Sequence, residues 1–369
     1  MRIFHIHGEQ FTELPDLPLT LPAQGFLWVG SERAEFEAGI AHIQAALQAW
    51  SGGQLVDLHV SDLLSRQLPS NYDYTSWYEV MVFRRLIAGA GNGSTSEAET
   101  PGTAATAREA LAAIDTSPVG FALFDRVLIT VHPTACAVRE YFAQRMAGMV
   151  VNTERGESRG SARLPTGPAD LMLRMLNYMV DSYLDLRRVL TKQLGALQGE
   201  LLAPGSRFED WQVLLDSRNT LHMLEDTCED QRAAVQEWID ALDEWPDEPD
   251  PEKRRERELL RVRSRDVLEH IERVLSHVRR LEHSAETAVQ MHFSALSHRT
   301  NDIMRTLTVL TAIFLPLNLI TGFWGMNFDV LPLIHNEAGA WGAVGLMAAV
   351  AVALMLVFRR KHYLSGRPR

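Results

Sequence analysis

Two long uncharged runs near the C-terminus most strongly constrain how this 369-residue chain folds. The first run is residues 306–328 (TLTVLTAIFLPLNLITGFWGMNF) and the second is residues 338–358 (AGAWGAVGLMAAVAVALMLVF). A helix needs about 20 predominantly apolar residues to cross a bilayer. The runs therefore predict two transmembrane helices, and a buried helical hairpin in a soluble core is the less favoured alternative.

The charges that flank the two runs predict their orientation. Residues 329–337, which join the runs, contain no Lys or Arg, whereas Arg299 and Arg305 precede the first run and residues 359–361 (RRK) follow the second. Because basic residues favour the cytoplasmic side, both termini are predicted to be cytoplasmic in a two-span protein of the cell inner membrane. The N-terminal MRIFHIHGEQF lacks the features of a signal peptide, so the N-terminal part is expected to stay in the cytoplasm.

A long helix is predicted to lead into the first run. Residues 252–315 contain neither Gly nor Pro, and a helix of this length would extend about 96 Å at 1.5 Å per residue. Its apolar residues recur at alternating spacings of four and three, which predicts a buried heptad seam. This seam consists of Val267, Ile271, Val274, Val278, Leu281, Ala285 and Ala288.

Inside the first run the same spacing continues with polar and small residues. This polar stripe consists of Asn301, Met304, Thr308, Thr311, Leu315, Asn318 and Gly322. Amides and hydroxyls are costly toward lipid, so the stripe is expected to face protein or water. Hydrogen bonding between helices and pore lining explain the spacing equally well, and a pore requires a symmetric oligomer. The second run carries Gly345, Ala349 and Ala353, which is typical of close helix packing.

Residues 165–300 are predicted to form a cytoplasmic helical hairpin and the long stalk helix. The segments 170–202 and 208–242 are helix-periodic and are separated by Pro204-Gly205. The acidic segment 243–252 (DEWPDEPDPE) is interpreted as a solvated turn, with a diffuse cation collector as the alternative.

Residues 1–150 are predicted to form a cytoplasmic α/β domain. Four segments (MRIFHIHG, GFLWVG, SWYEVMVFRRL and GFALFDRVLITVHP) have strand character, and residues 32–50 and 137–149 have helical patterns. Low-complexity residues 89–107 are predicted to be a disordered insertion. His5 and His7 would share one strand face, where ordinary half-buried positions are favoured over a metal site.

Several function classes find no support in the sequence. Cys136 and Cys228 lack any ligand spacing and are interpreted as small buried residues. The chain contains no GxGxxG, P-loop or HExxH motif, so an enzyme is not expected. The net charge of −11 argues against a nucleic-acid partner, because phosphate binding needs a basic surface.

The C-terminal block TNDIMRTLTVLTAIFLPLNLITGFWGMNF, with its short loop and second span, resembles the CorA family of divalent-cation transporters, including the related ZntB branch. Gly325, Met326 and Asn327 match the family's Gly-Met-Asn motif at the outer end of the first span. The resemblance implies an α+β membrane protein that forms a homopentamer with a cytoplasmic funnel. It also implies a pore-lining span at 301–324, an outer loop at 325–339, a second span at 340–358 and a basic cytoplasmic tail at 359–369.

The resemblance implies uptake of Mg²⁺, or of Co²⁺ or Ni²⁺, without an organic cofactor. Five copies of Asn327 would offer amide oxygens to a hydrated ion at the pore entrance, while Asp329 and Glu337 would attract ions to the outer loop. Asp266, with Glu269 one turn further on, falls where the family binds a regulatory cation between protomers.

The sequence departs from the family pattern at two positions. Trp324 stands where a tyrosine commonly precedes the motif, and Leu333 stands where many members have a glutamate. With His335 in the loop, a zinc transporter of the ZntB type is the alternative substrate assignment. A membrane-anchored coiled coil with a structural or signalling role is the alternative of another class.

Overall fold

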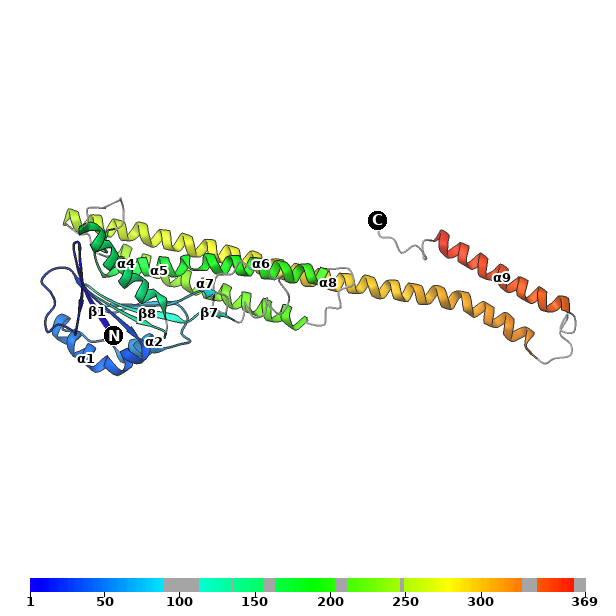
Figure 1. The fold of residues 1–369 in the computed structure, drawn as a ribbon, viewed down its shortest axis with the longest axis horizontal. Coiled ribbons are helices and arrows are strands. Elements are labelled where there is room, and N and C mark those ends of the chain that lie inside the picture. Colours follow the sequence, from blue (N-terminus) through cyan, green and yellow to red (C-terminus); the bar gives the residue numbers. More distant parts are fainter. Residues whose placement is uncertain are drawn as a thin grey trace. The chain divides into compact units, whose positions relative to one another are not determined.

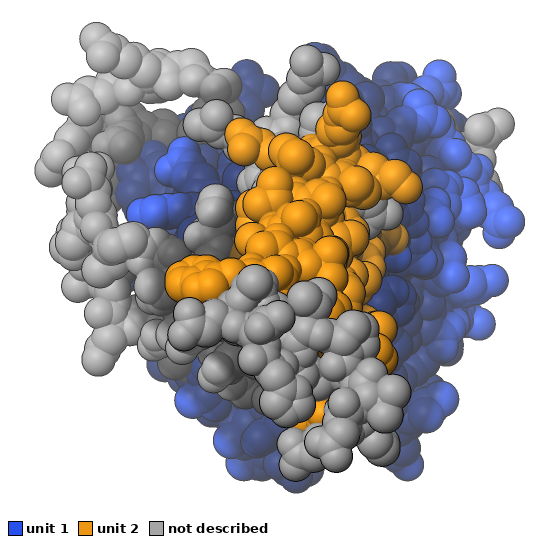
Figure 2. Space-filling view, turned by 90° about the vertical axis from the view of Figure 1, so that its right-hand side faces the viewer, with its two compact units in different colours: residues 1–287 blue, residues 288–369 orange. Residues whose placement is uncertain are grey.

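The computed structural model describes residues 1–88, 113–134, 136–154, 163–202, 211–245, 249–326 and 337–361. The predicted insertion at 89–107 lies outside these ranges. The chain divides into two compact units, residues 1–287 and 288–369, which Figure 2 colours separately. Each unit is described by itself below.

The first unit combines a mixed sheet with helices on both of its faces (Figure 1). Its strands are β1 (Arg2–His7), β2 (Gln10–Leu14), β3 (Phe26–Glu32), β4 (Asn71–Tyr74), β5 (Glu79–Arg84), β6 (Ile87–Ala88), β7 (Ile114–Asp115), β8 (Pro118–Phe124) and β9 (Val127–His132). Its helices are α1 (Arg33–Ser51), α2 (Asp57–Leu64), α4 (Ala137–Glu154), α5 (Pro168–Asp181), α6 (Tyr183–Leu202), α7 (Trp211–Glu244) and the first part of α8 (Pro251–Trp324). The second unit holds the rest of α8 and α9 (Glu337–Arg360).

The main sheet has the strand order β2-β1-β3-β9-β8-β5-β4. Its neighbouring strands are antiparallel except β3 and β9, which run parallel because the chain between them crosses over. The central strands β8 and β9 are buried along their whole length, so both faces of the sheet are covered. Strands covered on both faces read as nearly continuous apolar runs, which is how β8 and β9 appear in the sequence.

Helices α1 and α2 cover one face of the sheet, and α4 and α5 cover the other (Figure 1). On the first face Phe36 and Ile43 of α1 pack into one apolar cluster with Val29 of β3 and Ile129 of β9. On the opposite face the ring of Trp28 stacks on Phe4 with 4.7 Å between the ring centroids. This division follows from the two-residue period of a strand, which sends Trp28 and Val29 to opposite sides.

Local sequence determines where α1 begins and ends. Glu32 and Glu35 form a reciprocal capping box at its N-terminus. Gly52 follows the helix with φ of 72°, in the left-handed region that favours glycine, and its N–H donates to the Gln48 carbonyl. The helix predicted over residues 32–50 is therefore confirmed.

Two predicted elements differ in detail from the structure. The strand-like segment GFALFDRVLITVHP is a hairpin of β8 and β9, which turns at Asp125-Arg126. The single helix expected over 170–202 is interrupted at Ser182, whose hydroxyl donates to the Met179 carbonyl oxygen at 2.6 Å. Serine hydroxyls compete with the backbone in this way for helical hydrogen bonds.

The predicted heptad seam is buried within the single chain. All of its residues are buried except Leu281, which is half-buried. From Val267 to Ala285 the seam lies in the first compact unit, where its burial shows that this part of α8 packs within that unit. The seam therefore stabilises the protomer itself.

The two long apolar C-terminal helices have the opposite character. Only 6% of the most apolar 18-residue stretch of α8 is buried, and none of the corresponding stretch of α9 is buried. Leu315, Leu319 and Trp341 are 70%, 74% and 77% exposed. A core hairpin would bury such side chains, so the alternative of a soluble helical hairpin does not fit these residues. Two exposed apolar helices of this length are consistent with a membrane protein of two spans.

Candidate functional site

The predicted polar stripe follows one face of α8 in the second unit. Its members (Asn301, Met304, Thr308, Thr311, Leu315, Asn318 and Gly322) are all exposed in the single chain. The Thr308 and Thr311 hydroxyls donate to the Met304 and Leu307 carbonyl oxygens at 2.7 and 2.8 Å. Because each hydroxyl proton is used within the helix, the threonine oxygens are left as acceptors toward whatever faces the stripe.

The helix α8 ends at the first residues of the Gly-Met-Asn motif. Gly325 donates its N–H to the Thr321 carbonyl oxygen at 2.9 Å, and the Met326 N–H donates to the Phe323 carbonyl oxygen at 3.5 Å. A Cβ atom at Gly325 would lie 2.9 Å from the Thr321 carbonyl oxygen, closer than real Cβ contacts allow. This close approach is a structural reason for glycine at the first position of the motif.

The structure describes only one of the three remaining residues that were predicted to lie at the ion entrance or in the outer loop. Asn327 and Asp329 lie outside the described residues. Glu337 is the first residue of α9. Their assignment to the ion entrance therefore stays a prediction from the sequence.

Asp266, the predicted regulatory residue, lies on the surface of the first unit with its side chain 59% exposed. Its Oδ1 lies 3.8 Å from Nε2 of His270, and Nδ1 of His270 lies 3.3 Å from Oδ1 of Asp181 at the end of α5. Asp266 and Asp181 both line a pocket of about 440 Å³. Glu269 is 60% exposed and pairs with Arg273 one turn further on. Exposed carboxylate oxygens suit a hard cation such as Mg²⁺.

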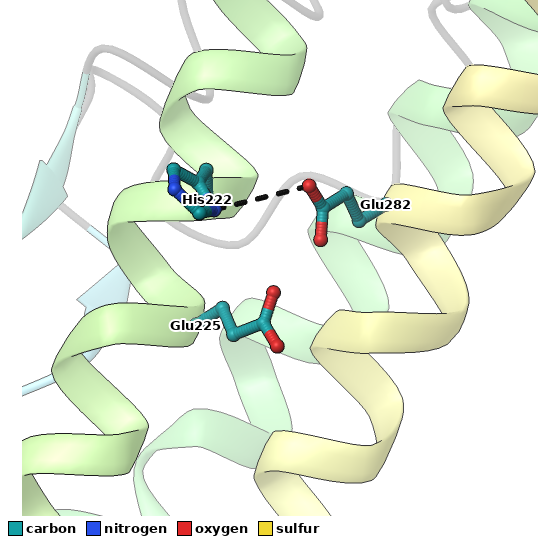
Figure 3. A group of neighbouring side chains, drawn as sticks. All are labelled: His222, Glu225 and Glu282. Carbon is teal, nitrogen blue, oxygen red and sulfur yellow. Dashed lines mark ion pairs between the residues drawn. The ribbon is translucent and has the colours of Figure 1, made fainter.

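One group of potential metal ligands was not predicted from the sequence. His222 and Glu225 of α7 and Glu282 of α8 point toward one another (Figure 3), and their ligand atoms all lie within 4.8 Å of one another. The His-x-x-Glu spacing on a predicted helix was the available signal, because residues three apart share a helix face. Nothing in the sequence indicated that Glu282 would join them.

The other candidate ligands behave as ordinary structural residues. His5 and His7 share a strand face as predicted, with parallel rings 6.4 Å apart, and Nε2 of His5 bonds to the Gln24 carbonyl oxygen at 2.9 Å. Cys136 and Cys228 are buried, and burial raises the pKa of both thiols, that of Cys228 to about 12. A raised pKa keeps a thiol protonated and unreactive, in agreement with the prediction of two small buried residues.

Most of the chain matches one known protein family. The family described as CorA-like Mg²⁺ transporter protein matches residues 104–360, which include α5 to α9. The chain belongs to this family. CorA membership confirms the resemblance that the Gly-Met-Asn block suggested, and it agrees with the prediction that the chain is not an enzyme, since the family is one of transporters.

Curated CorA proteins resemble this chain over a limited stretch. The cobalt/magnesium transport protein CorA of Thermotoga maritima is 30% identical over 100 residues, which are 27% of this chain and 28% of that protein. The magnesium transport protein CorA of Haemophilus influenzae (strain KW20) is 34% identical over 101 residues, which are 27% of this chain and 32% of that protein. Each alignment thus spans less than a third of the relative.

A solved CorA structure resembles the whole chain. The complete structure of the CorA magnesium transporter from Methanocaldococcus jannaschii aligns with a TM-score of 0.69 over 98% of both chains, at 18% sequence identity. At this identity the likeness concerns the fold. It confirms the predicted α+β class, with an N-terminal mixed sheet, a 74-residue helix and two apolar C-terminal helices.

Proposed function

We propose that this CorA-family chain transports divalent cations across the inner membrane, with Mg²⁺ as the principal substrate and Co²⁺ or Ni²⁺ as further substrates. The observation that carries the proposal is the stripe of exposed amide and hydroxyl side chains on an otherwise apolar helix. Toward lipid these groups would be costly. A homopentamer that turns the stripe of five α8 helices toward one axis removes this cost and encloses a polar path.

The chemistry of the stripe suits a hydrated cation. Mg²⁺ gives up its water reluctantly, so a path for it must accept hydrogen bonds from bound water. Asn301, Asn318 and the threonine oxygens are neutral acceptors, which attract the water shell without holding the ion tightly. Conduction requires this combination of entry and release. Met304 and Leu315 lie between these acceptors along the stripe and would form apolar constrictions that gate by dewetting.

The entrance residues Gly325, Met326 and Asn327 provide the sharpest test. In liposomes that contain the purified protein and a magnesium-sensitive dye, Asn327→Ala is expected to reduce Mg²⁺ influx to background, because five amide acceptors are lost. Asn336→Ala, the same substitution elsewhere in the outer loop, is the matched control and should retain influx. Asn327→Asp should bind cations more tightly at the entrance and change selectivity, since a carboxylate attracts them more strongly than an amide.

The outcome of this experiment separates the competing assignments. Influx at the wild-type level in Asn327→Ala, with the pentamer intact by native mass spectrometry, would remove Asn327 from the ion path. No influx of any cation through the wild type would favour the membrane-anchored coiled coil. Competition among Mg²⁺, Co²⁺, Ni²⁺ and Zn²⁺ in one preparation would distinguish the Mg²⁺ assignment from zinc transport of the ZntB type.

We also propose that internal cation regulates this transport through Asp266 and Glu269. Carboxylates that face one another across a protomer interface repel, and a divalent cation bound between them would relieve the repulsion. Binding at high internal Mg²⁺ would favour the closed, symmetric arrangement, and depletion would release it. The exposure of both side chains in the single chain supports the proposal, because an interface in the pentamer needs them accessible in the protomer.

A further inference from the structure

We propose that His222, Glu225 and Glu282 bind a transition-metal ion of the Zn²⁺, Co²⁺ and Ni²⁺ class between α7 and α8. The three side chains lie within the first compact unit and converge from two helices (Figure 3). They are separate from the polar stripe and from Asp266, so the site does not depend on the proposed transport function.

The spacing of the donor atoms fits a shared ion. Nδ1 of His222 lies 3.9 Å from Oε1 of Glu282, which is too long for a hydrogen bond. Two atoms that each lie about 2.1 Å from one metal ion are separated by about 3.4 Å in a tetrahedral site and by up to about 4.2 Å in other geometries. The observed separation falls within this range, so an ion could sit between the two side chains after small rotamer adjustments.

The accessibility of the ligands suits an ion that keeps some of its water. The side chains of Glu225 and Glu282 are 17% and 23% exposed, whereas that of His222 is 64% exposed. The carboxylates are therefore held between the helices, and the imidazole lies at the solvent edge where an ion would enter. Three protein ligands leave at least one position for water or another ligand, as in open metal sites.

The three ligands include two carboxyl groups, and an arginine pairs with one of them. Arg279 donates from Nε to Oε1 of Glu225 at 2.6 Å and also pairs with Glu229. Glu225 still contributes one carboxylate oxygen to the group of three. The carboxyl groups of Glu225 and Glu282 meet there from two different helices, and two neighbouring carboxylates repel one another. A divalent cation would relieve this repulsion.

The donor set selects against Mg²⁺. An imidazole nitrogen suits Zn²⁺, Co²⁺ and Ni²⁺, whereas Mg²⁺ prefers an all-oxygen shell. Binding would link α7 to α8, next to the Arg279 pairs that already join these two helices. The expected consequence is a metal-dependent gain in the stability of the first unit, because an ion that binds only the folded state stabilises it.

The test is a Zn²⁺ titration of the tag-free full-length protein by isothermal calorimetry, in detergent micelles with excess Mg²⁺ to occupy all-oxygen sites. We expect one Zn²⁺ per chain in the wild type. His222→Gln and Glu282→Gln should each raise the Kd for Zn²⁺ at least about tenfold, because loss of even an outer-shell partner costs a metal site that much. His283→Gln, which removes the exposed histidine next to Glu282, is the matched control and should bind as the wild type does.

Two further readouts keep the outcome decisive. Zn²⁺ should raise the apparent unfolding temperature of the wild type and of His283→Gln but not of His222→Gln, and size-exclusion profiles would verify that every variant is folded. With Co²⁺ as the probe, visible d–d absorption should disappear in His222→Gln. Equal Zn²⁺ binding by all variants, no binding by the wild type, or loss of binding on His7→Gln instead would overturn the proposal.

Discussion

His277 shows how a single buried side chain makes the stability of the protein depend on pH. It lies on α8 with only 7% of its surface exposed. Its Nδ1 lies 2.7 Å from the Tyr183 hydroxyl, and its Nε2 lies 3.4 Å from the Thr191 hydroxyl. Burial lowers the pKa of His277 from 6.5 to about 4, with Arg187 and Arg280 adding to the shift. The imidazole is therefore neutral at physiological pH in the folded protein.

The sign of the pH effect follows from this lowered pKa. Between pH 6.5 and about pH 4 the unfolded chain binds a proton at His277 and the folded chain does not. Stability is therefore complete above pH 6.5 and decreases as the pH falls through this window. We expect the apparent unfolding temperature to fall with pH in this range, measured by scanning fluorimetry in detergent.

Two histidine variants isolate the contribution of His277 from that of the carboxylates. His277→Gln should decrease the slope of unfolding temperature against pH, because the titrating group is gone. His283→Gln removes an exposed histidine from the same helix and should leave the slope unchanged. Equal slopes for both variants and the wild type would contradict the assignment.

At the scale of elements, α8 changes its environment along its length. In the first unit most of its seam is buried, whereas in the second unit most of its large apolar side chains are exposed. The hydrophobic effect therefore stabilises the first part within the protomer. The second part gains the same stabilisation only from lipid or from other chains.

Two identical substitutions on α8 test the packing role of the seam. Val278 is fully buried and Val262 is 63% exposed on the same helix. Val278→Ala is expected to destabilise the protein by about 2 kcal/mol, through lost burial and the cavity left behind. Val262→Ala should change stability by less than about 0.5 kcal/mol. Thermal unfolding of the two variants would measure the difference, and equal shifts would show that the seam is not the stabilising contact.

At the scale of the whole molecule, the predicted topology places both termini on one side of the membrane. Ser365→Cys in the basic tail and Leu333→Cys in the outer loop provide reporters for the two sides. In right-side-out spheroplasts a membrane-impermeant maleimide should label Leu333→Cys and should not label Ser365→Cys. The native Cys136 and Cys228 are buried with raised thiol pKa values, so background labelling should be low. The reverse pattern would invert the orientation.

The proposed regulation also belongs to the whole assembly, because it acts between protomers. Replacing both Asp266 and Glu269 with lysine should make influx independent of internal Mg²⁺, since the carboxylates that bind the ion are gone. Glu272→Lys changes the charge of a neighbouring exposed position on the same helix and is the matched control. Influx would be measured in liposomes loaded with graded Mg²⁺ concentrations. Inhibition of the double variant over the wild-type range would rule out this site.

The sequence alone determined the features that depend on short-range pattern. An uncharged run long enough to cross a bilayer, a heptad seam and a polar stripe are each visible in consecutive residues, because a helix repeats every 3.6 residues. The two apolar helices and the buried seam could therefore be predicted with their residues. The Gly-Met-Asn block carried the family resemblance in the same local way.

Only the tertiary structure decided which distant segments meet. The parallel pairing of β3 with β9 and the meeting of Glu282 with His222 depend on contacts between segments far apart in the chain. Local pattern carries no information about such partners, because a strand edge or a helix face can pack against many others. The packing of the whole unit selects among them, and that selection brought a histidine and two glutamates from α7 and α8 together.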